Sequence, residues 1–288
     1  MYYYRRLPPF EYVAPKSVHE AASFLQARQA ESRVMAGGTM VLHRLKERIG
    51  LRKYLVSLKE IHGFDSITST SSRLKVGCMV LLQAVADAPA VKKGCGMLAF
   101  ACARLGTPQI RAMGTLGGNV ASHLATAETI PVLIALGGEA TLVGAKGTRT
   151  VSIEELYKEL AGDELVTEVL VPLVKGRRWG YEKWAVRERF DYATASAAVA
   201  MTITRKVCKD VRIGLGGVTL PTRRAHKAED LLEGRSVNDK LIGEAASAAA
   251  EGAHTGADLH FTAAYKKELV AVMVKRALKQ AMREGRIV

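Results

Sequence analysis

The sequence predicts an α+β fold in two parts, and three observations support that prediction. Segments with the apolar period of a strand and segments with that of a helix follow one another along the whole chain. Two glycine-rich turns, Gly37-Gly38 and Gly114–Asn119, each precede a predicted helix. The composition changes near Val174–Arg178, and the last third carries strands and then three helical segments, so we expect a boundary there.

The N-terminal segment predicts a capped helix followed by a strand. Ser17 can accept a hydrogen bond at a helix N-terminus, and Glu20 stands three residues later, as in a capping box. We therefore expect residues 17–25 to be helical. Residues 32–36 are expected to form a short strand that runs directly into the first glycine turn.

The segment after the first glycine turn predicts an amphipathic helix. Its apolar residues fall on one face at helical spacing: Val41, Leu42, Leu45 and Ile49. Gly50 is expected to end this helix, because glycine readily adopts the conformation found just past a helix C-terminus. Later strands are expected at residues 54–58, 74–78, 140–143, 150–152, 166–171, 193–204 and 211–215. Later helices are expected at residues 96–105, 129–136, 227–233, 239–252 and 262–284.

The composition is that of an ordinary globular protein with a basic excess. The 288 residues are 48% hydrophobic and carry a formal net charge of +14. No apolar run reaches the roughly 20 residues that a membrane-spanning helix needs, and the N-terminus lacks the pattern of a signal peptide. We therefore expect a cytoplasmic protein. The basic residues are spread along the chain without an RNA-binding motif, which favours a solvated surface or a docking face for acidic proteins over nucleic acid.

The four cysteines fit no metal-binding motif. Cys78, Cys95, Cys102 and Cys208 lack the paired spacing of zinc or iron–sulfur ligands, and we expect buried free thiols. If this chain transfers electrons, it therefore uses an organic cofactor rather than its own cluster.

The two glycine turns are the main chemical signal. Glycines let a backbone approach a phosphate closely, and the amides at the start of a helix attract an anion. Thr39 can cap the first helix or donate its hydroxyl to a phosphate, and Thr115 and Asn119 add side-chain hydrogen bonds to the second turn. A single Gly-Gly pair is usually only a turn, but two such turns favour a diphosphate cradle. Neither turn has the spacing of a P-loop, so the residues leave the ligand open.

A resemblance to a known family narrows that choice. The chain resembles the FAD-binding subunits of the xanthine dehydrogenase and carbon monoxide dehydrogenase family over essentially its whole length. The motifs that carry the resemblance are Ala36-Gly-Gly-Thr39, Pro108-Gln-Ile-Arg111, Gly114-Thr-Leu-Gly-Gly-Asn119, Tyr181-Glu-Lys183, Asp191-Tyr-Ala-Thr194, Ala264-Tyr-Lys-Lys267 and Val274-Lys-Arg-Ala277.

The resemblance implies a fold like that of vanillyl-alcohol oxidase. In this PCMH-type α+β fold, FAD lies between two α+β subdomains, and a smaller α+β C-terminal domain follows. We expect the FAD-binding domain at residues 1–175, with subdomains of about 1–58 and 59–175. The C-terminal domain, like that of carbon monoxide dehydrogenase flavoproteins, is expected at 176–288.

The resemblance also implies which residues hold FAD. The first turn would bind the pyrophosphate through its backbone. The second would hold the diphosphate and nearby ribityl oxygens, and residues 109–110 would lie near the adenosine. The expected FAD-binding residues are Ala36, Gly37, Gly38, Thr39, Met40, Gln109, Ile110, Gly114, Thr115, Gly117, Gly118, Asn119, Glu128, Lys183 and Tyr192.

Four of these residues need comment. Glu128 stands where the family often has Asp and would reach a ribityl hydroxyl, whereas Met40 replaces a common Asp or Ser and removes one polar contact. Lys183 would lie near the pyrimidine edge of the isoalloxazine, where a cation stabilises reduced flavin. Tyr192 would pack against the ring. Without the resemblance, the favoured interpretation of Glu128, Lys183 and Tyr192 is a helix-terminal acid, a solvated strand residue and a packed aromatic.

The implied function is that of an FAD-carrying electron-transfer subunit of a molybdenum hydroxylase complex. Electrons would pass between two [2Fe–2S] clusters on a small partner subunit and an external acceptor, while a large partner subunit would carry the molybdopterin cofactor. A dimer of heterotrimers is expected. A stand-alone FAD-dependent reductase or oxidase of the same fold is the alternative, and a basic nucleic-acid-binding or scaffold protein is a third.

Overall fold

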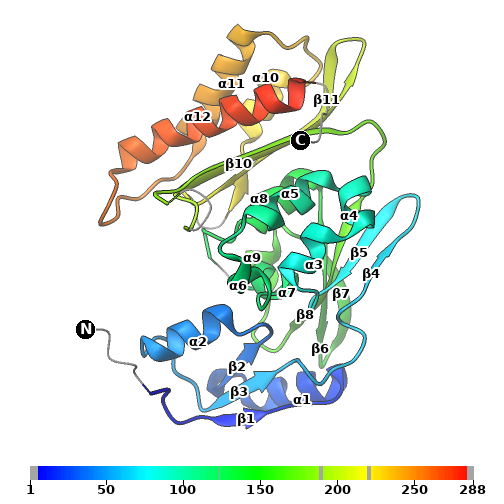
Figure 1. The fold of residues 1–288 in the computed structure, drawn as a ribbon, viewed down its shortest axis with the longest axis vertical. Helices are drawn as coiled ribbons and strands as arrows, with labels where there is room; N and C mark the ends of the chain where they lie inside the picture. Colours follow the sequence, from blue (N-terminus) through cyan, green and yellow to red (C-terminus); the bar gives the residue numbers. More distant parts are fainter. Residues whose placement is uncertain (1–5, 123, 188–190, 219–221, 284–288) are drawn as a thin grey trace.

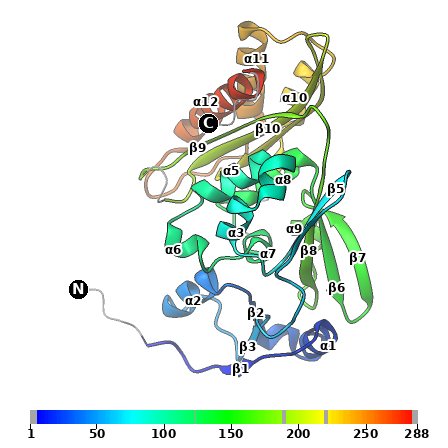
Figure 2. The same ribbon diagram turned by 45° about the vertical axis from the view of Figure 1, so that its right-hand side comes forward.

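The computed structural model describes residues 6–122, 124–187, 191–218 and 222–283. Within them the chain forms three β-sheets with helices packed on them, which confirms the predicted α+β class. The three sheets succeed one another along the long axis of the molecule, with the N-terminal sheet at one end and the C-terminal sheet at the other (Figures 1 and 2).

The N-terminal sheet is parallel and has the strand order β1-β3-β2. Its elements are β1 (Glu11–Val13), α1 (Val18–Arg28), a 3-10 turn (Gln29–Glu31), β2 (Ser32–Met35), α2 (Thr39–Lys46) and β3 (Tyr54–Ser57). The predicted cap of α1 is confirmed, because the Ser17 hydroxyl accepts a hydrogen bond from the Glu20 amide at 3.1 Å. The Glu20 carboxylate accepts from the Lys16 amide rather than from that of Ser17.

The predicted end of α2 at Gly50 is wrong. The helix ends at Lys46, and Arg48 takes the left-handed backbone conformation at φ 63°. The amide of Arg48 donates to the Leu45 carbonyl and that of Ile49 to the Arg44 carbonyl, which is the bonding pattern of a Schellman motif. An arginine thus occupies the position where glycine is usual. Ile49 falls outside the helix and is 56% exposed instead of packing on its apolar face.

The middle of the chain forms a five-stranded antiparallel sheet and a group of short helices. The strand order is β4-β5-β8-β6-β7. The strands are β4 (Ile67–Ser69), β5 (Arg73–Gly77), β6 (Glu139–Gly144), β7 (Gly147–Ser152) and β8 (Leu165–Pro172). The helices are α3 (Leu82–Asp87), α4 (Pro89–Gly94), α5 (Gly96–Arg104), α6 (Pro108–Arg111), α7 (Leu116–Val120), α8 (Thr129–Leu136) and α9 (Leu156–Glu159). The predicted hairpin is confirmed as β6 and β7.

The C-terminal sheet is antiparallel, with the order β12-β11-β10-β9. Its strands are β9 (Arg178–Trp184), β10 (Ala195–Thr204), β11 (Val207–Gly216) and β12 (Arg223–Arg224). The helices α10 (His226–Leu232), α11 (Asp239–Gly252) and α12 (Ala263–Met282) follow, and α12 lies across the sheet (Figure 1).

Strand β10 is buried on both faces, and this explains its almost entirely apolar sequence. Ala197 and Val199 pack into the core formed with α11 and α12, whereas Ala198 and Ala200 pack into the core of the middle region. Successive side chains of a strand point to opposite faces, so an uninterrupted apolar run serves both cores. The C-terminal sheet therefore shares a core with the region that carries the second glycine turn.

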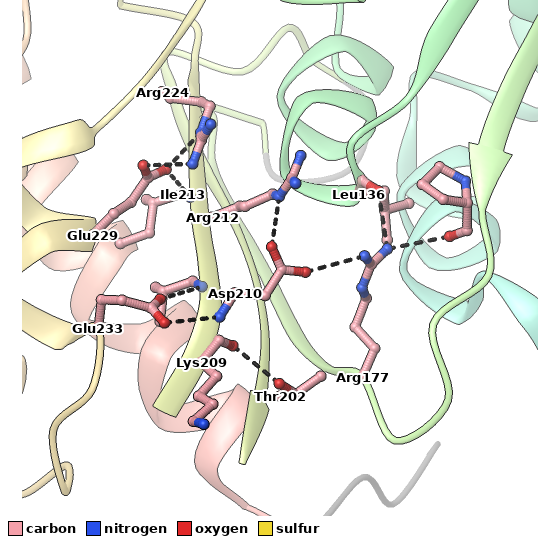
Figure 3. A network of polar contacts seen from close by, with 12 residues as sticks. Leu136, Arg177, Thr202, Lys209, Asp210, Arg212, Ile213, Arg224, Glu229 and Glu233 are labelled. Carbon is pink, nitrogen blue, oxygen red and sulfur yellow. Dashed lines mark hydrogen bonds and ion pairs between the residues drawn. The ribbon is translucent and has the colours of Figure 1, made fainter. Parts of the chain in front are cut away.

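A polar network ties the C-terminal sheet to the helix α8 (Figure 3). The Arg177 guanidinium donates to the carbonyl of Leu136 at 2.9 Å, at the end of α8, and to that of Pro172 at 3.3 Å. It also pairs with Asp210 of β11 at 3.5 Å, and Asp210 in turn accepts from Arg212. These contacts fix the position of α8, whose opposite end lies at the candidate site.

The predicted domain boundaries, after residue 58 and after residue 175, both fall between strands and remain predictions. The four cysteines are buried, as expected, and burial raises the pKa of each thiol. In the part of the chain that the structure describes, no helix combines the length and apolar character that crossing a membrane requires.

Candidate functional site

A cleft of about 950 Å³ brings most of the predicted site residues together. Both glycine turns line it, as do Ile110, Glu128 and Tyr192. The predicted residues that line the cleft are Ala36, Gly37, Gly38, Thr39, Met40, Ile110, Gly114, Thr115, Gly117, Gly118, Asn119, Glu128 and Tyr192. Gln109 is exposed and does not line it, and Lys183 lies behind Glu128. A cleft of this size is ample for a dinucleotide-sized ligand.

The first glycine turn presents backbone donors to the cleft. Gly38 caps α2 in the left-handed conformation, at φ 78°, which glycine adopts without steric cost. In the described part of the chain, the amides of Gly37, Gly38, Thr39 and Met40 have no protein acceptor. The Thr39 hydroxyl also has none there, and Thr39 is the first residue of the helix rather than its cap. These donors, at a helix N-terminus, suit an anion.

The second glycine turn uses its backbone donors within the protein. Its amides donate to nearby protein oxygens: Gly114 to Ile110, Leu116 to Val80, Gly117 to Cys78, and both Gly118 and Asn119 to Thr115. The Thr115 hydroxyl caps α7 by accepting from the Gly118 amide at 3.0 Å. Among the described residues, the Thr115 amide alone in this turn has no protein acceptor, so the backbone of the turn offers few donors to a ligand.

The two turns contact each other, and their glycines make that contact possible. A Cβ atom at Gly37 would overlap the carbonyl oxygen of Met113, immediately before the second turn. A Cβ at Gly118 would lie 3.4 Å from the Cβ of Ala36 and 2.9 Å from the Thr115 hydroxyl. The glycines therefore form a close-packed joint that sets the spacing of the turns across the cleft.

Asn119 connects the second turn to α8. Its side-chain oxygen accepts hydrogen bonds from the Thr129 hydroxyl at 2.6 Å and from the Thr129 amide at 3.4 Å. The side-chain NH₂ group of Asn119 has no protein acceptor among the described residues, and the residue lines the cleft. Asn119 thus anchors the start of α8 with one end of its amide and can donate to a ligand with the other.

Glu128 and Lys183 form a buried ion pair at the far wall of the cleft. Their side chains are 3% and 2% exposed, and Lys183 Nζ lies 2.8 Å from Glu128 Oε1. Burial raises the pKa of Glu128 from 4.5 to about 7, although Lys183 and the Tyr181 hydroxyl, 3.4 Å from Oε2, act in the opposite direction. The carboxyl group at the cleft wall can therefore change its charge near neutral pH.

Lys183 holds three segments together. Besides Glu128, its ammonium donates to the carbonyl of Arg104 at 3.2 Å and to that of Asp191 at 3.1 Å. Tyr192 follows Asp191, lines the cleft and is 57% exposed. Lys183 therefore acts on the cleft through Glu128 and the Asp191–Tyr192 segment.

Other lining residues were not predicted from the sequence. Leu105, Gly106, Leu165 and Val166 form apolar parts of the wall, and sequence periodicity marks them only as core residues. Arg111 positions two of them, because its guanidinium donates to the carbonyls of Leu105 and Gly106 at 3.3 and 3.0 Å and so shapes that wall. Four arginines also line the cleft: Arg33, Arg44, Arg52 and Arg187.

Comparison with known protein families decides the identity of the ligand. Residues 8–174, which include both glycine turns and Glu128, match the family described as "FAD binding domain in molybdopterin dehydrogenase". The chain belongs to this family. Residues 181–281 match a second family, the "CO dehydrogenase flavoprotein C-terminal domain". The family and the cofactor predicted from the sequence are thereby confirmed, and the chain is an oxidoreductase subunit.

Members of this FAD-binding family resemble the chain over nearly its full length. It is 31% identical over 281 residues to the nicotine 6-hydroxylase medium subunit of Paenarthrobacter nicotinovorans, covering 96% of this chain and 98% of the relative. It is 32% identical to the carbon monoxide dehydrogenase medium chain of Hydrogenophaga pseudoflava, covering 95% and 97%.

Solved structures give the same result. A carbon monoxide dehydrogenase from Hydrogenophaga pseudoflava superposes with a TM-score of 0.93 at 32% identity, and quinoline 2-oxidoreductase from Pseudomonas putida 86 with 0.89 at 29%. Each comparison covers 96% of this chain and 98% of the other.

The cleft fits the diphosphate of FAD. The amides of the first turn, which have no acceptor among the described residues, provide donors for an anion, and the glycines let the two turns approach each other beside it.

Proposed function

We propose that this chain is the FAD-carrying electron-transfer subunit of a molybdenum hydroxylase complex. It would pass electrons between [2Fe–2S] clusters of a small partner subunit and an external acceptor. The observation that carries the proposal is the first glycine turn, whose amides have no protein acceptor among the described residues and which lines a cleft formed mostly by residues of the matched FAD-binding region.

The proposed roles of the glycine-turn residues follow from their hydrogen-bond donors that have no acceptor among the described residues. The backbone of residues 36–40 binds the diphosphate, and the side chains of Thr115 and Asn119 add donors on the opposite side. Gln109 and Ile110 are assigned to the adenosine end. Together with the remaining glycines of the two turns, they complete the set predicted from the sequence.

The isoalloxazine end is assigned to Glu128, Lys183 and Tyr192. Glu128 would accept a hydrogen bond from a ribityl hydroxyl, and Tyr192 would cover the ring and exclude water from it. Lys183 contributes by holding Glu128 and the Asp191 carbonyl in place rather than by lining the cleft. When bound, FAD supplies the redox chemistry; the chain supplies binding, orientation and local charge.

The proposed partners are a large molybdopterin-binding subunit and a small [2Fe–2S] subunit, assembled as a dimer of heterotrimers in the cytoplasm. Support comes from the relatives, which are named medium subunits or medium chains of hydroxylases and dehydrogenases. In such a complex, the substrate would be transformed on the large subunit, and this chain would only transfer the electrons of that reaction.

The experiment is to purify the full chain, alone and co-expressed with a large molybdopterin-binding and a small [2Fe–2S] subunit from the same organism, and to quantify flavin after denaturation. We expect about one FAD per chain in the complex and rapid bleaching of flavin absorbance when the complex is reduced. Reduction through the complex should require the [2Fe–2S] subunit. A colourless complex would refute FAD binding, and full turnover by the chain alone would favour a stand-alone reductase instead.

A further inference from the structure

Three arginines that have no anionic partner in the described part of the chain line one part of the cleft. Arg33 lies on β2, Arg44 on α2, and Arg52 on the loop that leads to β3. Arg52 donates only to the carbonyl of Leu51 at 2.9 Å. Within the described residues, Arg33 and Arg44 make no side-chain hydrogen bond, and none of the three forms an ion pair.

The charges of the cleft wall show why this is unusual. Among the described residues, each acidic residue that lines the cleft is paired with a cation: Glu128 pairs with Lys183, Glu164 with Arg149, and Asp191 with Arg187. The arginine cluster, defined as Arg33, Arg44 and Arg52, therefore holds the unbalanced charge of the wall. A ligand in the cleft would supply the missing anion.

The backbone is arranged to bring these side chains together. Gly50 has φ 62°, and a Cβ at that position would lie 3.0 Å from Nη2 of Arg33, so glycine leaves room for the guanidinium. The left-handed residue Arg48 turns the chain back just before it. The pKa of Arg33 is lowered, first by burial and then by the nearby charges of Arg52 and Arg44. Like charges gathered in this way attract an anion.

We propose that Arg33, Arg44 and Arg52 form an oxyanion subsite of the cleft that binds a phosphoryl group. Guanidinium groups match phosphate oxygens with paired hydrogen bonds, and the same cleft already carries the amide donors of the first turn. Arg44 lies five residues along α2 from Thr39, a rise of about 7.5 Å, so the subsite is separate from the turn but within reach of one extended nucleotide.

Two sources can supply that phosphoryl group. One is the diphosphate of FAD itself, in which case the arginines hold the cofactor from the side opposite the second turn. The other is a second phosphorylated ligand that binds beside FAD. The inference rests on the proposed FAD site for its location, but its chemistry can be tested separately.

The test compares two double variants of the full chain. Arg44→Gln/Arg52→Gln removes two charges from the cluster. Lys275→Gln/Arg276→Gln removes two charges from exposed positions of α12, at the other end of the molecule (Figure 1). Binding of FAD, riboflavin and inorganic pyrophosphate to flavin-free protein is measured by calorimetry, and pyrophosphate binding is repeated on FAD-loaded protein.

We expect the cluster variant to bind pyrophosphate at least about tenfold more weakly than the α12 variant, with riboflavin binding equal in both. If FAD also binds at least tenfold more weakly, and FAD-loaded protein takes up no pyrophosphate, the source is the diphosphate of FAD. If FAD affinity is unchanged and FAD-loaded wild-type protein binds pyrophosphate, the source is a second ligand.

Equal affinities of the two variants for both FAD and pyrophosphate would overturn the proposal. So would selective loss of a partner subunit from the cluster variant, because the arginines would then form a protein docking surface. Wild-type protein that binds pyrophosphate through the cluster but never binds FAD would instead refute the proposed function and leave the oxyanion subsite standing.

Discussion

The first glycine turn, residues 36–40, and the second, residues 114–119, share a Gly-Gly pair and a neighbouring threonine but differ in their hydrogen bonds. The amides of Gly37 to Met40 have no protein acceptor in the described structure, whereas almost every amide of the second turn donates to a protein carbonyl or hydroxyl. The sequence predicts that the backbone amides of both turns bind an anion. The structure supports it fully only for the first.

The difference shows what glycine does in each place. In the first turn, Gly38 supplies a left-handed cap and leaves donors free at the start of an eight-residue helix. In the second, Gly117 is packed so closely on Cys78 that a Cβ would overlap that residue. We therefore propose that the first turn receives the ligand and that the second mainly holds the first at a fixed distance. Four predictions test this division, beginning with the largest expected effect.

The largest effect is expected at Gly37, where the two turns meet. Gly37→Val would force a side chain into the Met113 carbonyl and push the turns apart, at a cost of about 1–3 kcal/mol from overpacking. We expect FAD content to fall below about a tenth of wild type because the cradle loses its shape. Flavin released on denaturation and the urea unfolding midpoint measure the two effects.

Gly243→Ala is the matched control, because a Cβ at Gly243 of α11 would meet no atom within 4 Å. It should leave FAD content near wild type and raise the free energy of unfolding by about 0.5–1 kcal/mol, because alanine is a better helix former than glycine. Normal FAD content in Gly37→Val would show that contact between the turns is unnecessary for binding.

The second prediction concerns the charge of Glu128, which is linked to the second turn but not to the first. The first turn has no ionisable side chain, whereas the second leads through Asn119 and Thr129 to Glu128, whose pKa is raised by burial from 4.5 to about 7. Because the folded state binds this proton more tightly than the unfolded chain, Glu128 contributes stability that is fully present below about pH 4.5 and lost as the pH rises to about 7. Each unit of such a shift is worth about 1.4 kcal/mol.

Urea unfolding at intervals from pH 5 to pH 8 checks this for wild type and Glu128→Gln. The wild-type free energy of unfolding should fall more steeply with rising pH than that of the variant. The slopes decide the outcome rather than the absolute stabilities, because the variant also leaves Lys183 without its anion. Parallel curves would mean that Glu128 does not titrate in this range.

Some parts of the site could be predicted from the sequence and others could not. The helix α8 was predicted at residues 129–136 because its apolar run is continuous, and the two glycine turns stood out by composition. The hydrogen bonding of the amides of the second turn could not be predicted, because their acceptors, the carbonyls of Cys78 and Val80, lie more than thirty residues earlier in the chain. The same holds for the pairing of Glu128 with Lys183, 55 residues apart, which depends on how the C-terminal sheet packs against α8.

The third prediction uses the two threonines as a matched pair. Thr115→Ala removes the cap of α7 and should lower the free energy of unfolding of flavin-free protein by about 1 kcal/mol. Thr39→Ala should leave that stability unchanged, because its hydroxyl has no protein partner among the described residues, but should weaken FAD binding by up to about tenfold. Chemical unfolding and FAD titration of both variants give the comparison, and equal effects of the two substitutions would remove the distinction between the turns.

The smallest effect is expected where the second turn meets α8. Thr129→Val keeps the shape of a fully buried side chain but removes the 2.6 Å hydrogen bond to Asn119, at a cost of about 1 kcal/mol in the free energy of unfolding. Thr129→Ser, which retains the hydroxyl, should recover most of that bond. If the second turn serves mainly as a support, the loss should appear in the stability of flavin-free protein and change FAD affinity by less than about threefold. A larger loss of affinity than of stability would instead place Asn119 in direct control of the cofactor, and the second turn would then be a binding element equal to the first.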